Sequence, residues 1–232
     1  MTCRIRLAGG LIALAALSFE LACEKKAVVT NSGSETAKQL APVSKEPGWA
    51  EYQMEAEGFT ISLPPDWRQV DMDPKTFDRI TSELVRQKPE LRPMFASLRQ
   101  QIAAGCKFFG FDLPSAKTGF ATNVNVICFR LRPGDTLDSI VAENLAQMGG
   151  LSTISKPITH ERIISSGGDR ERLRYLLTVR SANGQDSTKS VTQYFLANGQ
   201  NGFALTLVTL PDQSAKYTQV FEKIATSFRL IK

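Results

Sequence analysis

The sequence predicts an α+β domain in which an antiparallel sheet of about seven strands is flanked by helices. First, several short stretches alternate apolar and polar residues, which is the period of a half-buried strand. Second, longer stretches repeat apolar residues every three to four positions, as amphipathic helices do. Third, short connections join the last four strand-like stretches, which favours an antiparallel meander.

The composition of the 232-residue chain is that of an ordinary globular protein, with 42% apolar and 22% charged residues. It excludes a wholly disordered chain, a collagen and a coiled coil. The chain has a single histidine, which excludes most His-rich metal sites and any mechanism that needs two imidazoles. The net charge of +5 is too small to imply a nucleic-acid partner.

Residues 1–22 are predicted to be an export signal. Two arginines precede an apolar run over residues 7–19, which is shorter than the roughly 20 residues that a membrane-spanning helix needs. The segment ends in Ala22, directly before Cys23, and this junction resembles the bacterial lipobox, although Glu20 stands where that pattern has an apolar residue. The resemblance implies lipidation of Cys23; a cleaved, freely soluble exported protein is the alternative.

Residues 23–51 are predicted to be a flexible tether. They are rich in Ser, Thr, Lys, Glu and Pro and show no apolar period, so they cannot bury enough apolar surface to fold. A coil of this length spans roughly 30 Å, enough to hold a folded domain just clear of a bilayer.

The folded domain begins with a predicted strand at residues 59–63 and two helices. Asp73 can cap the first helix, with Pro74 at the position where a missing N–H costs nothing. A break at residues 88–89 separates this helix from a second one that ends near Gly105.

The remaining elements follow the same two periods. Thr136 is the predicted N-cap of a helix over residues 136–148. Asn198 and Gly199 are typical of a hairpin turn. The sequence shows no internal repeat and no second core, so we expect residues 52–232 to form one domain. The other predicted elements are strands near 106–111, 122–131, 152–165, 170–180, 189–196 and 203–210 and a closing helix over 212–228.

Two stretches resemble the ends of the PsbP-like fold. They are GFTISLPPDWRQV at residues 58–70 and YTQVFEKIATSFRL at residues 217–230. In that fold a strand and a Leu-Pro-x-x-Trp turn open the domain, and a helix ending in Ser-Phe-Arg closes it. The fold includes a Ran-binding nuclear import factor and resembles exported bacterial lipoproteins of the LpqN and DcrB kind. The resemblance implies mostly non-enzymatic binding or assembly roles, and it supplies no catalytic residues.

Two of the four cysteines fall in the predicted sheet. If their strands form a hairpin about residue 117, Cys106 lies directly opposite Cys128, and a cross-strand disulfide is geometrically reasonable. Two buried thiols that act as small apolar residues are the alternative. A metal site is not expected, because no histidine or third cysteine is near.

Four arginines share one face of the predicted strand at residues 170–180. This stripe is a candidate contact surface for an anionic lipid or an acidic envelope protein. A solvated outer face, with counter-charges from a neighbouring strand, is the alternative. The four residues are Arg170, Arg172, Arg174 and Arg180.

Three further patterns have simpler explanations than a functional site. His160 and Glu161 are adjacent in a strand and point to opposite faces, so they cannot form a dyad. Asp71 and Asp73 could bind a cation, but the following proline favours a helix cap. The aromatic stretch at residues 107–111 could line an apolar pocket, although packing between sheet and helices explains it more simply.

The sequence lacks the motifs of hydrolases, phosphate-binding loops, zinc proteases and EF-hands, so it favours a protein without catalysis, cofactor or metal. The leading hypothesis is a non-enzymatic exported lipoprotein that serves as a binding or assembly module of the bacterial cell envelope. It would be anchored at the cell membrane or outer membrane, with no transmembrane helix in its mature form. The alternative is a carrier that holds a small apolar ligand between sheet and helices; a hydrolase ranks third.

Overall fold

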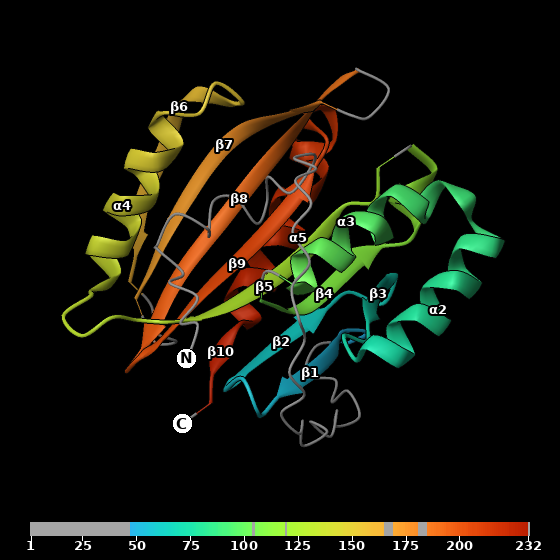
Figure 1. Ribbon diagram of the computed structural model, residues 1–232, viewed down its shortest axis with the longest axis horizontal. Helices are drawn as coiled ribbons and strands as arrows, with labels where there is room; N and C mark the ends of the chain where they lie inside the picture. The colour runs from blue at the N-terminus through green and yellow to red at the C-terminus, as the bar shows by residue number, and fades with distance from the viewer. Residues whose placement is uncertain (1–46, 104, 119, 165–168, 181–184, 232) are drawn as a thin grey trace, which may run out of the picture.

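The computed structural model describes residues 47–103, 105–118, 120–164, 169–180 and 185–231. Within them, ten strands form a seven-stranded and a three-stranded sheet, and all paired strands are antiparallel (Figure 1). The predicted α+β class is therefore confirmed. The predicted export signal, Cys23 and most of the predicted tether lie outside the described residues.

The seven-stranded sheet has the order β3-β4-β5-β9-β8-β7-β6. The last four strands form the predicted meander, and β8 turns into β9 at Gly199, whose φ of 58° suits glycine. Strand β5 pairs with β9, which joins the β3-β4-β5 unit to the meander. The strands are β3 (Trp67–Val70), β4 (Cys106–Asp112), β5 (Asn123–Arg130), β6 (Ile154–Ile163), β7 (Arg170–Arg180), β8 (Asp186–Asn198) and β9 (Asn201–Thr209).

The first predicted strand lies in a separate small sheet and not in the main one. The strands of the small sheet are β1 (Ala50–Met54), β2 (Phe59–Leu63) and β10 (Arg229–Leu230), in the order β1-β2-β10. The predicted strand at 59–63 thus belongs to this sheet, and the unpredicted β3 takes its place in the main one. Strand β1 also begins inside the stretch predicted as tether, because it pairs with β2 along its whole length.

Four helices cover the two faces of the main sheet (Figure 1). Helices α2, α3 and α4 supply the core on one face, and α5 packs with the small sheet on the other. In α4, Thr136 and Ser139 form a capping box, as the predicted N-cap requires. The helices are α2 (Pro74–Gln87), α3 (Arg92–Ala103), α4 (Leu137–Gly149) and α5 (Ser214–Ser227).

The aromatic residues of β4 are divided between the two cores. Phe111 faces α3, where its ring centroid lies 6.0 Å from that of Phe95. Phe108 points to the other face and meets Tyr52 at 5.6 Å and Phe59 at 6.5 Å. All of these rings except the half-buried Tyr52 are fully or nearly fully buried. Packing on both sides of the sheet therefore accounts for the aromatic stretch at 107–111.

The acidic pair at the start of α2 forms a capping structure. A side-chain oxygen of Asp73 accepts the backbone N–H of Thr76 at 3.0 Å, and Asp71 accepts that of Asp73 at 2.9 Å. We expect Asp73→Ala to lower the free energy of unfolding by about 1 kcal/mol. Asp73→Asn should stay near the parent value, because asparagine caps equally well. Urea unfolding checks this, and equal losses in both variants would contradict the cap.

Candidate functional site

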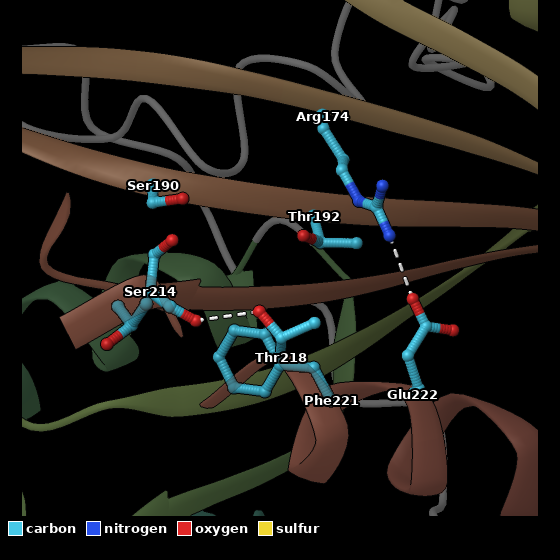
Figure 2. Close-up of a pocket in the computed structure, with 8 residues that line it drawn as sticks. Arg174, Ser190, Thr192, Ser214, Thr218, Phe221 and Glu222 are labelled. Atoms are coloured by element: carbon cyan, nitrogen blue, oxygen red, sulfur yellow. Dashed lines mark hydrogen bonds and ion pairs between the residues drawn. The ribbon is translucent and has the colours of Figure 1, made fainter. Parts of the chain in front are cut away.

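A groove of about 220 Å³ lies between α5 and the strands β7, β8 and β9. Figure 2 shows the strand residues on one side and the helix residues on the other. The lining combines five hydroxyl side chains, one ion pair and one aromatic ring. It consists of Arg174, Ser190, Thr192, Thr209, Ser214, Thr218, Phe221 and Glu222.

Strand register brings the four sheet residues to one wall. Arg174 of β7 lies opposite Thr192 of β8, and Ser190 of β8 lies opposite Thr209 of β9. Residues that oppose each other in antiparallel strands share a face, and so do residues two apart in one strand. The four side chains therefore all point toward α5, away from the core under α4.

Helical spacing forms the other wall. Ser214, Thr218 and Glu222 follow one another at intervals of four residues, so they lie along one face of α5. Phe221 lies beside them and is buried in the core that α5 shares with the sheet. This spacing is visible in the sequence, but nothing there indicates which strands the helix covers. The groove therefore cannot be predicted from the sequence.

Glu222 accepts hydrogen bonds from three side chains of the sheet. Its carboxylate lies 2.8 Å from the guanidinium of Arg174 and 3.2 Å from the hydroxyl of Tyr194, and it also pairs with Arg172. Burial raises the pKa of Tyr194, so this hydroxyl keeps its proton and remains a donor. The Arg174 and Glu222 side chains remain 43% and 40% exposed. Both signs of charge are therefore accessible from solvent at this point of the groove.

Three of the five hydroxyls are free both to donate and to accept hydrogen bonds. Within the described part of the chain, the side chains of Ser190, Thr192 and Ser214 make no hydrogen bond. In contrast, Thr218 donates to the backbone carbonyl of Ser214 at 2.9 Å (Figure 2). Thr209 is buried and shares a 2.9 Å hydrogen bond with Thr122.

A buried polar cluster continues from Thr209 beneath the groove. Thr122 donates its backbone N–H to the hydroxyl of Ser115, which in turn donates to the carbonyl of Asp112. Tyr217 of α5 donates its hydroxyl to the Asp112 carboxylate. Burial and this carboxylate raise the pKa of Tyr217 to about 12. The cluster ties the start of α5 to β4 and so supports the groove from below.

Two residues of the predicted arginine stripe, Arg170 and Arg172, lie under α5 and form no open surface. Arg170 is buried and donates to the carbonyl of Ala225 in the last turn of α5. Its burial lowers its pKa. Arg172 is 11% exposed and pairs with Glu161 as well as with Glu222. These two arginines thus form neither an open contact surface nor a solvated outer face, since a helix about 50 residues further along the chain covers them.

The other two arginines have different surroundings. Arg174 lines the groove. Arg180, at the end of β7, is 76% exposed and lies 3.6 Å from Asp186. Of the four arginines, Arg174 is the one that lines the groove.

The difference between Arg172 and Arg180 gives a matched pair of variants. Arg172→Met removes two ion pairs and a cation–π contact with the Tyr194 ring at 5.9 Å. We expect it to lower the free energy of unfolding by about 1–2 kcal/mol. Arg180→Met should cost less than about 0.5 kcal/mol, because its exposed pair is screened by solvent. Urea unfolding at equal ionic strength compares them; equal costs would contradict the burial argument.

His160 contacts a carboxylate on the neighbouring strand, which its neighbours in the sequence do not indicate. Its Nε2 lies 2.7 Å from the carboxylate of Glu171 in the neighbouring strand β7. Glu171 is buried, and Arg162 lies 3.6 Å from its other oxygen. As predicted, His160 does not act with Glu161, which instead pairs with Arg172. The His160 contact is part of a network of polar contacts across the β6–β7 edge.

Cys106 and Cys128 are free thiols in the structure. The assumed register is right where Phe108 lies opposite Val126, but a bulge between Cys106 and Phe108 places Cys106 opposite Ile127. As a result, Cys106 packs in the core under α2 to α4, whereas Cys128 packs against the core under α5. The bulge thereby removes the direct opposition on which the expected disulfide depended.

Two general features of the described residues bear on the site. They contain no group of three or more His, Cys, Asp or Glu arranged to hold a metal ion. None of their helices is long and apolar enough to cross a membrane.

No family model and no curated protein matches the sequence. Among solved structures, PsbP (CyanoP) of Synechocystis sp. PCC 6803 is 15% identical, and the match covers 85% of this chain and 98% of that one with a TM-score of 0.51. LpqN of Mycobacterium tuberculosis, described as involved in cell envelope biogenesis, is 12% identical over 82% and 90% of the chains, with a TM-score of 0.47. The yeast Ran-binding protein Mog1p is 9% identical over 78% and 95%, with a TM-score of 0.41. The chain has the PsbP-like fold, as its two end stretches predict. This similarity establishes the fold alone.

Proposed function

We propose that this chain is a non-enzymatic binding module of the bacterial cell envelope, exported and anchored to a membrane through lipid at Cys23. The groove beside α5 is the observation that carries the binding role. Its two charged wall residues are bound to each other, and its other polar side chains are hydroxyls. Such a lining suits recognition by hydrogen bonds, whereas acid–base or covalent catalysis needs a base held against a nucleophile.

The proposed envelope location is supported by the predicted export signal, the lipobox resemblance and the predicted tether. A tether of that composition would leave the α+β domain free to turn its groove toward a neighbouring component. Because α5 covers Arg170 and Arg172, the arginine stripe gives little support to binding of an anionic lipid surface. The polar lining likewise gives no support to a carrier of an apolar ligand, because burying unpaired hydroxyls is costly.

The anchoring part of the proposal is tested by intact mass. The full chain and Cys23→Ser are expressed in the native host and fractionated. We expect the parent in the membrane fraction with a mass that begins at Cys23 and includes acyl chains. Cys23→Ser should lack the acyl mass. An unacylated parent chain in the soluble fraction would overturn the lipid anchor.

The binding part is tested by photo-crosslinking in the same host. One photoreactive residue replaces Thr218 in the groove, and a control replaces the exposed Ala146 of α4 on the opposite face of the sheet. We expect an envelope component to be captured from the Thr218 position and not from the Ala146 position. Capture from neither position, or equally from both, would contradict a binding function at the groove.

A further inference from the structure

We propose that the groove binds a zwitterionic group, with an oxyanion at Arg174 and a primary ammonium at Glu222. This inference rests on the proposed binding function and specifies its ligand class. Two sources share the chemistry: a free α-amino acid, and the phosphoethanolamine headgroup of a lipid. Each carries an anionic oxygen and an N–H-bearing cation a few ångströms apart.

The charges on the groove wall select against ligands of a single sign. The Arg174 guanidinium and the Glu222 carboxylate are in contact at 2.8 Å, and both remain accessible. A lone anion at Arg174 would also face the carboxylate, and a lone cation at Glu222 would also face Arg172 and Arg174. A ligand with both charges can instead add one favourable contact to each partner, in line with electrostatic complementarity.

The free hydroxyls also suit a ligand that carries both an oxyanion and an ammonium group. Ser190, Thr192 and Ser214 can each donate one hydrogen bond and accept others. Donated bonds suit the oxygens of a carboxylate or phosphate, and accepted bonds suit the N–H groups of an ammonium. A quaternary ammonium has no N–H to donate, so it would leave these acceptors unpaired.

The size of the groove suits a headgroup and not a folded partner. Its volume of about 220 Å³ is below the range of roughly 300–1,000 Å³ that is typical of pockets for larger ligands. Phe221 supplies an apolar surface among the polar side chains, against which the short carbon link of the ligand can lie. The groove therefore fits a small molecule or the end of a larger one.

The test measures binding to the purified full chain by calorimetry. The soluble probes are phosphoethanolamine and L-alanine, with inorganic phosphate, methylamine and glucose as controls for one charge or none. Vesicles of phosphatidylethanolamine are compared with vesicles of phosphatidylcholine. We expect at least one zwitterionic probe to bind about tenfold or more tightly than every control, because each control loses a charged hydrogen-bonded contact.

Variants locate the binding. Arg174→Met and Glu222→Gln should each weaken binding about tenfold or more. Thr192→Val, which removes one free hydroxyl without touching the ion pair, should weaken it less. Arg180→Met is the matched control on the same strand and should bind like the parent. Unfolding curves identify a variant that has lost its fold. If Arg174→Met or Glu222→Gln does not fold, Thr192→Val still tests whether the ligand binds in the groove.

The outcomes distinguish the two ligand sources, and they distinguish failure of the zwitterionic ligand from failure of the binding function. Binding of phosphatidylethanolamine vesicles, but not of phosphatidylcholine vesicles or L-alanine, identifies the ligand as the lipid headgroup. Binding of L-alanine, but not of phosphatidylethanolamine vesicles, identifies it as the amino acid. Tight binding of phosphate, methylamine or glucose alone, or no binding of any probe, overturns the zwitterionic ligand. If the Thr218 position still captures an envelope component, only the ligand class fails and the binding function remains.

Discussion

Replacement of Phe59 by alanine should lower the free energy of unfolding by about 3–5 kcal/mol. Phe59 is completely buried, and its ring stacks on that of Phe228 with centroids 5.0 Å apart. It also meets Phe203 at 6.1 Å and Phe108 at 6.5 Å. This ring therefore joins the small sheet, the end of α5 and the main sheet. Its removal would leave a cavity at the junction of all three.

Urea unfolding followed by circular dichroism measures this effect. The matched control is Ile164→Ala, because Ile164 is 80% exposed and should contribute less than about 0.5 kcal/mol. Phe59→Leu keeps most of the apolar volume and should lie between the parent and Phe59→Ala, even if the alanine variant does not fold. A similar loss in Phe59→Ala and Ile164→Ala would contradict the packing described for this ring.

The stability of the protein should also fall steeply above pH 9, because the two free thiols of the described residues are buried, Cys106 fully and Cys128 in part. Burial raises the pKa of Cys106 and of Cys128 from 9.0 to about 12. The unfolded chain ionises both thiols from about pH 9 upward, while the folded chain keeps them protonated. Their contribution is therefore complete below pH 9 and is lost as the pH rises through 12. Each thiol removes about 1.4 kcal/mol per pH unit in this window, or roughly 4 kcal/mol together at pH 10.5.

Unfolding free energies at pH 8 and pH 10.5, measured in reducing buffer, test this dependence. The double variant Cys106→Ala/Cys128→Ala should lose much less stability between the two pH values than the parent. Some loss should remain, because the pKa of Tyr217 is also raised to about 12. The comparison is the change with pH within each protein, so a general cost of the substitutions does not affect it. The same loss in parent and variant would refute the contribution of the thiols.

Helix α5 both forms one wall of the groove and covers part of β7. The helix supplies Ser214, Thr218 and Glu222 to the groove and covers Arg170 and Arg172 of β7. Loss of α5 packing would therefore remove the site and expose the arginines at the same time. For each groove variant, an unfolding curve is therefore needed to distinguish loss of binding from loss of α5 packing.

Short-range signals in the sequence were enough to predict most of the elements. The cap at Asp73, the capping residue Thr136 and the turn at Gly199 each act on backbone groups within a few residues. The meander β6 to β9 followed from alternation and short connections. Even the register opposite Phe108 could be inferred, because a hairpin pairs strands that are close in the chain.

The elements that were missed depend on partners far along the chain. The two-residue strand β10 exists only because β2 lies beside it, about 170 residues earlier. Strand β3 has four residues, too few for a clear alternation. The bulge at Cys106 adds one residue to one strand, so a cysteine pairing that depended on an uninterrupted register was lost.

The sequence by itself determined the α+β class, the PsbP-like ends, the order of the principal elements and the face shared by the arginines. These follow from backbone preferences and apolar periods, which act locally. Only the tertiary structure decided that α5 covers that face, that Glu222 binds Arg172 and Arg174, and that the hydroxyls of two strands and a helix meet in one groove. The physical reason is that burial and charge pairing depend on which surfaces pack together, and an amphipathic helix specifies an apolar face without specifying the strands that it covers.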